Sequence, residues 1–172
     1  MEGFKIFLVE DDDSIRKLIS DRIETKGIEV DSAPNGLEAL QKISSDVDDY
    51  YLIISDVNMP KMNGLALISQ LKELGFRNKI AIMSSLDDVR VFKEAIRLGV
   101  DYFVDKPIQL QNLDGIIQKA KKSYEKKIEL DYTMQLLSEY KDAVDKSTIV
   151  SKTDKTGKIT FVNDKFCEIS GF

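Results

Sequence analysis

The sequence contains no histidine and a single cysteine among its 172 residues. The absence of histidine excludes imidazole acid–base catalysis, histidine-ligated zinc and a phosphohistidine intermediate on this chain. Because Cys167 is alone, one chain can form neither a disulfide nor a cysteine metal cluster, and a reducing compartment suits it. Any histidine chemistry must therefore come from a partner.

Long hydrophobic runs are also absent, since the longest apolar stretches have the length of strands, so we expect no membrane span. The first five residues lack the basic segment and apolar core of a secretory leader, which favours a cytoplasmic protein. The net charge of −5 argues against a nucleic-acid groove, because phosphate binding needs clustered Lys and Arg. We read the basic stretch 119–127 as a solvated helix face, so no nucleic acid is expected to bind within this chain.

Short apolar runs alternate with amphipathic segments five times along residues 4–104. Strands are predicted at 4–9, 29–32, 51–55, 79–83 and 102–104. The intervening helices are expected to bury Ile15, Leu18, Ile19 and Ile23 before Gly27, then Leu37, Leu40 and Ile43 after Asn35-Gly36, then Leu65, Leu67, Ile68 and Leu71, and finally Val89, Phe92, Ala95 and Ile96 within 87–98. This alternation predicts an α/β fold, a doubly wound five-stranded parallel sheet of order 2-1-3-4-5 that is flavodoxin-like.

Acidic residues stand at the ends of the first and third predicted strands, where Glu10, Asp11 and Asp56 occur. In a sheet of this order, ligands bind beyond the carboxyl ends of these two neighbouring strands. Like charges about 4 Å apart repel by about 4 kcal/mol at a dielectric near 20. We therefore expect a cation to bind between these acids and offset their repulsion. Ser84 and Lys106 end later strands and supply a hydroxyl and an ammonium for phosphoryl oxygens.

Four short motifs carry a resemblance to a known family. They are Val9-Glu10-Asp11-Asp12, Asp56-Val-Asn-Met-Pro60 followed by Gly64, Met83-Ser84-Ser85 and Asp105-Lys106-Pro107. With these motifs in this order at strand ends, residues 1–122 resemble the receiver domain of two-component response regulators. The resemblance implies that Asp56 accepts a phosphoryl group from a sensor histidine kinase or phosphotransfer protein.

The resemblance also implies a divalent cation, Mg²⁺ or alternatively Mn²⁺. Its ligands would be Asp11, Asp56 and the backbone carbonyl of Asn58, with Glu10 acting mainly through water. Lys106 would pair with Asp56 and then with the phosphoryl group, whereas Ser84 and Phe103 would act as switch residues. The family further implies a cis peptide bond before Pro107. The only chemistry expected is autocatalytic phosphoryl acceptance and dephosphorylation, since no independent enzyme domain is seen.

Other interpretations remain open for these residues. An acid after a strand can cap a helix, which we expect of Asp12 or Asp13. Ser84 could simply satisfy backbone groups, and Phe103 could be a core residue. A phosphohydrolase of the haloacid dehalogenase type also uses an aspartate nucleophile, but it needs a second acid where Asn58 stands. A pseudo-receiver serving as a dimerisation scaffold is the remaining alternative.

Beyond Pro107 the pattern changes to one extended C-terminal helix reaching about Lys146. Its apolar positions approximate a heptad seam with a register shift near Lys127: Ile117, Ala120, Tyr124 and Ile128, then Leu130, Met134, Leu137 and Val144. We interpret 123–147 as a helical linker, a candidate coiled coil that would join two copies in a homodimer. The alternative is a helix folded back on its own receiver.

The tail, residues 148–172, predicts a strand, an Asp/Gly turn, a second strand and the start of a helix. It resembles the truncated N-terminal part of a PAS sensory domain. We expect its hairpin to be poorly ordered, or to bury its apolar face against a second copy or the long helix. The sequence as a whole thus suggests a phosphoacceptor module that relays a change through a helical stalk to a PAS-linked output.

Overall fold

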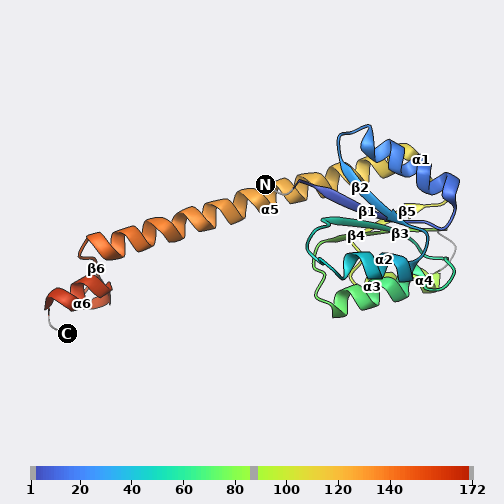
Figure 1. Ribbon diagram of the computed structural model, residues 1–172. Coiled ribbons are helices and arrows are strands. Elements are labelled where there is room, and N and C mark those ends of the chain that lie inside the picture. Colours follow the sequence, from blue (N-terminus) through green and yellow to red (C-terminus); the bar gives the residue numbers. More distant parts are fainter. Residues whose placement is uncertain (1–2, 86–88, 171–172) are drawn as a thin grey trace. The chain divides into compact units, whose positions relative to one another are not determined.

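The computed structural model describes residues 3–85 and 89–170, and a five-stranded parallel sheet forms the centre of its N-terminal unit (Figure 1). The strands are β1 (Lys5–Val9), β2 (Glu29–Ala33), β3 (Leu52–Asp56), β4 (Lys79–Ser84) and β5 (Tyr102–Asp105). They pair in the order β2-β1-β3-β4-β5, which confirms the predicted fold class. Val9 lies opposite Ser55, and Asp56 lies opposite Met83, so β1, β3 and β4 end at one edge.

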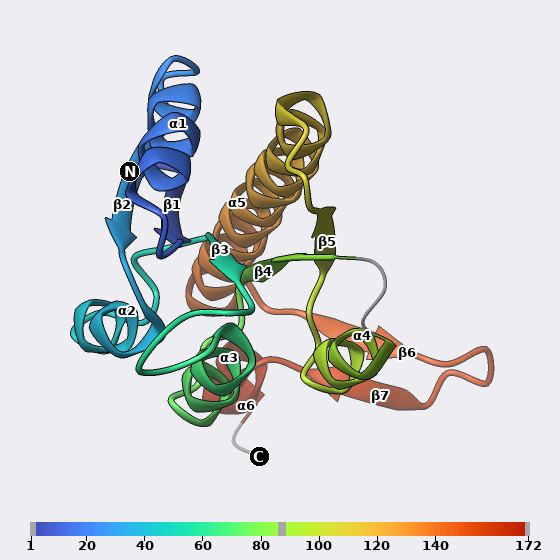
Figure 2. The same ribbon diagram turned by 90° about the vertical axis from the view of Figure 1, so that its right-hand side faces the viewer.

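Helices cover both faces of the sheet, as a right-handed β–α alternation requires. They are α1 (Asp13–Glu24), α2 (Gly36–Ile43), α3 (Gly64–Glu73), α4 (Val89–Arg97) and the first turns of α5 (Leu110–Ser147). Figure 2 shows α1 and the start of α5 on one face and α2, α3 and α4 on the other. Part of the predicted start of the fourth helix, at 87 and 88, lies outside the described residues.

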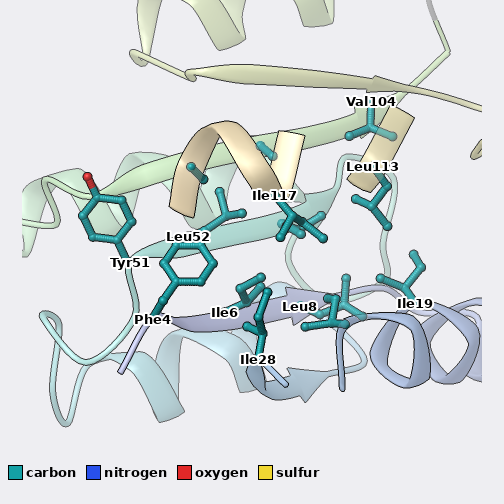
Figure 3. Packing of buried hydrophobic residues seen from close by; sticks show 14 of the residues in the cluster. Phe4, Ile6, Leu8, Ile19, Ile28, Tyr51, Leu52, Val104, Leu113 and Ile117 are labelled. Carbon is teal, nitrogen blue, oxygen red and sulfur yellow. The ribbon is translucent and has the colours of Figure 1, made fainter. Parts of the chain in front are cut away.

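Two hydrophobic cores sandwich the sheet, because strands that are covered on both faces have apolar residues throughout. One core, seen in Figure 3, joins β1 and β3 to α1 and α5 through side chains such as Phe4, Ile6, Leu8, Ile19, Leu52, Leu113 and Ile117. The other joins the opposite face to α2, α3 and α4 through side chains such as Phe7, Ile43, Ile53, Leu67, Ile68 and Ala95. The sheet therefore has little freedom to shift between its helix layers.

The prediction for α4 was largely wrong about which residues are buried. Val89, Phe92 and Ile96 are 59%, 44% and 56% exposed, whereas Ala95 is fully buried. A small side chain allows the helix to lie close to the sheet, and the larger apolar side chains then point outward. Periodicity identifies an apolar stripe but does not say whether that stripe faces the core.

The same correction applies to one residue in each of the first two helices. Leu18 of α1 is 54% exposed and Leu37 of α2 is 42% exposed, while their partners Ile19, Ile23 and Ile43 are buried as predicted. Each exposed leucine lies beside the buried side chains of its helix and not among them. Single apolar side chains exposed in this way are common on protein surfaces.

The chain divides into two compact units, 1–124 and 125–172, and α5 runs through the boundary as one 38-residue helix. This finding confirms the extended C-terminal helix. The second unit continues with β6 (Ser151–Thr153), β7 (Ile159–Val162) and α6 (Asp164–Ser170), so the predicted strand, turn, strand and helix are present. β6 and β7 pair antiparallel.

Asn163 holds the second unit together at the point where β7 meets α6. Within the described residues 125–170 it alone is buried. Its side-chain amide donates to the carbonyl of Thr148 at 2.6 Å, just past the end of α5, and its side-chain oxygen accepts from the amides of Val150 and Phe166. One side chain thus joins the helix end, the hairpin and α6.

Within residues 3–85 and 89–170, none of the helices has the length and apolar character needed to cross a membrane.

Candidate functional site

Three carboxylates converge at the carboxyl edge of the sheet. Glu10 and Asp11 follow β1, and Asp56 ends β3; one oxygen of each lies within 4.8 Å of the others. The strand pairing of Val9 with Ser55 places these acids side by side although they are distant in sequence. Glu10 and Asp56 are 1% and 4% exposed, whereas Asp11 is open to solvent. The structure thus brings together the acids that the sequence singled out.

Lys106 supplies the positive charge that this cluster needs. Its Nζ lies 2.6 Å from Oδ2 of Asp56 and 3.4 Å from Oε2 of Glu10. Burial alone would lower the pKa of Lys106, but the hydrogen bond and charge of Asp56 outweigh it, so its pKa lies above the usual value. The side chain is therefore a permanent ammonium beside the aspartate.

The environment of Glu10 favours its uncharged form, whereas that of Lys106 favours the charged form. Burial raises the pKa of Glu10 above its usual value, and the nearby Lys106 opposes that rise only in part. The backbone amide of Asp12 donates to Oε1 of Glu10 at 3.2 Å, which fixes the orientation of this carboxylate. A buried carboxylate with a raised pKa is one that a second cation would stabilise.

Asp12 has the capping role that was expected of Asp12 or Asp13. Its Oδ1 accepts hydrogen bonds from the amides of Ser14 and Ile15 at 2.8 and 3.0 Å, so it caps the N-terminus of α1. Asp13 lies in the first turn and pairs with Arg16. Asp12 is thereby occupied away from the acidic cluster.

Arg16 was missed in the sequence. Its guanidinium donates to the backbone carbonyl of Glu10 at 2.7 Å and also pairs with Asp13, so it ties the first turn of α1 to the loop that carries the acids. A cation one turn into a helix that follows an acidic loop was the available clue. The contact itself depends on how tightly the chain turns, which periodicity does not reveal.

The loop after Asp56 is positioned by contacts to its backbone. The Ser55 hydroxyl donates to the carbonyl of Asp56 at 2.8 Å, and the amide of Asn58 donates to Oδ1 of Asp56 at 3.4 Å. A Cβ on Gly64 would lie 2.1 Å from the Asp56 carbonyl oxygen, a separation that no side chain can adopt. Only glycine therefore allows α3 to begin against Asp56. The role of Ser55 in holding this loop was not predicted from the sequence.

Ser84, at the end of β4, and Phe103 of β5 lie together. Both line a cavity of about 20 Å³ with Phe92, and the Phe92 and Phe103 ring centroids are 4.6 Å apart. Ser84 is half-buried and its hydroxyl donates to the carbonyl of Ser85 at 3.3 Å. Phe103 is also half-buried, so its ring has contact with both the core and solvent. The peptide bond between Lys106 and Pro107 is cis.

The donor set fits a hard divalent cation. Carboxylates and a backbone carbonyl are the oxygen ligands that Mg²⁺ and Mn²⁺ prefer, and Mg²⁺ keeps several of its waters when bound. The buried Glu10 and Asp56 leave the exposed Asp11 to face solvent, which is the direction from which a hydrated ion would enter. Glu10, Asp11 and Asp56 therefore form an acidic pocket suited to Mg²⁺.

Comparison with known proteins supports this description. A family model for the response regulator receiver domain matches residues 6–118. The Regulatory protein AtoC of Escherichia coli is 29% identical over 134 residues, and the match covers 78% of this chain and 29% of AtoC. The Transcriptional regulatory protein CrdR of Helicobacter pylori is 33% identical over 116 residues, covering 67% of this chain and 54% of CrdR. The chain thus spans from about a third to about half of these relatives.

Solved structures give the same result. The N-terminal domain of an uncharacterised Wolinella succinogenes protein superposes with a TM-score of 0.68 at 30% identity, covering 73% of this chain and 99% of that one. The chemotaxis protein CheY4 of Vibrio cholerae gives 0.62 at 28% identity, covering 68% and 98% respectively. Fold, acidic pocket and family match agree, and this chain belongs to the response regulator receiver domain family.

Proposed function

We propose that this chain is the phosphoacceptor module of a two-component phosphorelay and that Asp56 takes a phosphoryl group from a sensor histidine kinase or phosphotransfer protein in the cytoplasm. The observation that supports this most is the 2.6 Å pair of Lys106 and Asp56 beside two further carboxylates. The chain has no histidine of its own, so the phosphohistidine must be the partner's.

In the proposed reaction, a carboxylate oxygen of Asp56 attacks phosphorus in line while the bond from phosphorus to the donor nitrogen breaks, which leaves an acyl phosphate. Lys106 stays beside the transferred group and neutralises part of its charge. Mg²⁺ or Mn²⁺, held by Asp11, Asp56 and the Asn58 carbonyl, with Glu10 acting mainly through water, would neutralise the rest when bound. Water attack on the acyl phosphate resets the module.

Ser84 and Phe103 are proposed as the switch residues. The hydroxyl of Ser84 would leave the Ser85 carbonyl and donate to the phosphoryl group, which opens space in the cavity that it shares with Phe103. The phenyl ring can then turn inward from its half-buried position. Because Phe103 has no hydroxyl, a partner should recognise its exposed state through apolar contact alone.

We propose that the chain consists of a receiver at 1–122, a helical linker at 123–147 and the opening part of a PAS domain at 148–172. The linker carries large apolar side chains that are 42% to 64% exposed: Ile128, Leu130, Met134, Leu137, Tyr140 and Val144. Leu130, Leu137 and Val144 recur every seven residues, the spacing of a coiled-coil seam. We infer a homodimer in which this stripe is paired and the change at Asp56 is relayed to a PAS-linked output.

Incubation with Mg²⁺ and acetyl phosphate, followed by intact mass spectrometry, tests the phosphoacceptor function. We expect the mass gain of one phosphoryl group in the wild-type chain and none in Asp56→Asn. No gain, or a gain that persists in Asp56→Asn, would favour the scaffold alternative. Continuous release of phosphate from many substrates in multiple turnovers would favour a phosphohydrolase.

A further inference from the structure

The loop between β3 and α3, residues 57–63, is held at both ends by backbone hydrogen bonds. The amide of Gly64 donates to the carbonyl of Val57 at 2.9 Å, which joins the two ends of the loop to each other. At its far end the amide of Gly36, the first residue of α2, donates to the carbonyl of Met62 at 3.2 Å. A loop that follows the phosphoacceptor is therefore attached to a helix from a different part of the chain.

The far attachment needs glycine at position 36. A Cβ there would lie 2.7 Å from the carbonyl oxygen of Met62 and 2.9 Å from Cγ of the same residue. The first of these contacts is with backbone, which cannot rotate away as a side-chain end can. Any side chain at Gly36 would therefore push residues around Met62 away from α2 and break the hydrogen bond.

Lys61 adds a second attachment and adopts an unfavourable backbone conformation to do so. Its φ of 64° makes it the one non-glycine residue in the left-handed region among residues 3–85 and 89–170. Its ammonium lies 2.9 Å from Oε1 of Glu38. Strained residues of this kind persist where the surroundings over-determine them, and they cluster at functional sites.

Glu38 is itself held in place for this contact. The buried Asn35 donates from its side-chain amide to Oε1 of Glu38 at 2.8 Å and accepts the backbone amide of Glu38 at 3.1 Å. Asn35 is the N-cap of α2, and these two hydrogen bonds join its side chain to both the backbone and the side chain of Glu38. They leave Glu38 fixed on the side that faces Lys61, so the ion pair has a rigid partner on α2.

We propose that Gly36, Glu38 and Lys61 form a loop latch whose task is to position the backbone carbonyl of Asn58 for a divalent cation. Asn58 is three residues before Lys61, and its own amide is tied to Oδ1 of Asp56. With both ends of the loop fixed, the peptide after Asn58 has few orientations left. These are positioning residues, and the inference rests on the metal site of the proposed function.

The latch predicts an effect on ion selectivity as well as affinity. Mg²⁺ requires near-ideal octahedral geometry, whereas Ca²⁺ accepts more ligands in flexible arrangements. A misplaced carbonyl should therefore weaken Mg²⁺ binding much more than Ca²⁺ binding. The carboxylates of Glu10 and Asp11 follow a different strand and are left in place, so some affinity for both ions remains.

Calorimetric titration of the full chain with MgCl₂ and with CaCl₂ tests the latch through Gly36→Ala. We expect the Mg²⁺ dissociation constant to rise about ten-fold or more, as for lost outer-shell contacts, and the Ca²⁺ constant by less than about three-fold. Gly115→Ala is the matched control, because a Cβ at that helical glycine meets nothing within 4 Å. Equal Mg²⁺ constants for wild type and Gly36→Ala would overturn the proposal.

Two substitutions at Lys61 decide the matter if Gly36→Ala does not fold. Both Lys61→Asn and Lys61→Val remove the ion pair, but Asn tolerates the left-handed region and Val does not. We expect Lys61→Val to bind Mg²⁺ about five-fold more weakly than Lys61→Asn. Identical Mg²⁺ constants for this pair, with metal-free melting temperatures that show both to be folded, would refute the latch.

The outcomes separate this inference from the proposed function. If the wild-type chain binds no Mg²⁺, the metal site and the latch both fail. If the wild type binds Mg²⁺ and Asp56→Asn weakens it, while the Gly36 and Lys61 variants match the wild type, only the latch fails. Mg²⁺-selective losses in those variants support the latch.

Discussion

At the scale of single residues, the site depends on one ammonium shared by two buried carboxylates. Lys106 lies within 3.4 Å of both Glu10 and Asp56, and both acids are almost completely buried. Two negative charges in such surroundings repel strongly once the lysine is gone. The resting site is thus stable only because its positive charge is built into the fold.

The substitution Lys106→Met tests this balance in the metal-free protein. We expect the free energy of unfolding at pH 7 to fall by about 1–3 kcal/mol, because two buried acids lose a charged hydrogen-bond donor. Urea denaturation measures the change. Saturating Mg²⁺ should recover much of the loss, since the ion would replace the missing positive charge; no recovery would contradict the placement of the metal site.

A second prediction concerns the effect of a side chain at Gly64 on the stability of the fold and on the position of Asp56. A Cβ at this position would lie 2.1 Å from the Asp56 carbonyl oxygen, so its absence allows α3 to begin against Asp56. Gly64→Ala should lower the free energy of unfolding by about 1–3 kcal/mol, as overpacking typically does, and should displace Asp56, the proposed phosphoacceptor. Urea denaturation checks the stability, and the phosphorylation assay checks the displacement. Gly115→Ala, inside α5, should leave phosphorylation unchanged and should raise the free energy of unfolding, because alanine favours a helix more than glycine does.

At the scale of elements, an ion cluster joins α1 to the first turns of α5. Asp114 accepts from Nη2 of Arg22 at 2.6 Å and from Nε at 3.3 Å, and Nζ of Lys26 lies 3.1 Å away. The hydrogen bonds from Arg22 lower the pKa of Asp114 below its usual value. The cluster fixes the start of the long helix against α1.

The contribution of Asp114 to the stability of the fold should decrease as the pH falls. Because the folded-state pKa of Asp114 is lowered, its stabilisation is present above the unfolded value of 3.8 and is lost as pH falls through the folded value. Asp114→Asn should therefore melt at a lower temperature than wild type at pH 7, with the gap closing in strong acid. Asp21→Asn, on the exposed side of α1, is the control; a gap that stays constant with pH would contradict the account.

Sequence reasoning recovered the strands and their order because buried parallel strands are continuous apolar runs that are easy to recognise. It brought Glu10, Asp56 and Lys106 together because strand ends share one edge. The predicted burial of Val89, Phe92 and Ile96 in α4 was wrong, because an apolar stripe in a sequence does not show whether it faces the core or the solvent. Sequence reasoning could not find the contact of Lys61 with Glu38, which depends on a loop conformation that no periodicity encodes.

At the scale of the whole molecule, the division near Tyr124 makes the first unit a candidate for independent folding. Both hydrophobic cores draw only on residues up to Tyr124. A chain truncated after Tyr124 should unfold with a free energy within about 1 kcal/mol of the same unit in the full chain. Calorimetric melting of both proteins tests this, and a molten truncated chain would show that α5 stabilises the receiver beyond that point.

The proposed homodimer gives the last prediction. Replacing Leu130 and Leu137 together by lysine places charge on the seam, so sedimentation should show a monomer where the wild type is a dimer. Tyr132→Lys with Glu139→Lys adds lysine at the same seven-residue spacing on the helix face opposite the seam and should leave the dimer intact. A wild type that sediments as a monomer, or a seam variant that stays dimeric, would exclude this helix face as the interface.

The junction around Asn163 limits how movement could leave the long helix. The same amide that satisfies the carbonyl beyond α5 also anchors the hairpin and starts α6, so these segments cannot slide past one another singly. A twist imposed on the end of α5 must turn all three as one piece, or else abandon several hydrogen bonds at once. A rotation of the end of α5 should therefore be transmitted to the hairpin and α6, with little of it absorbed by local bending.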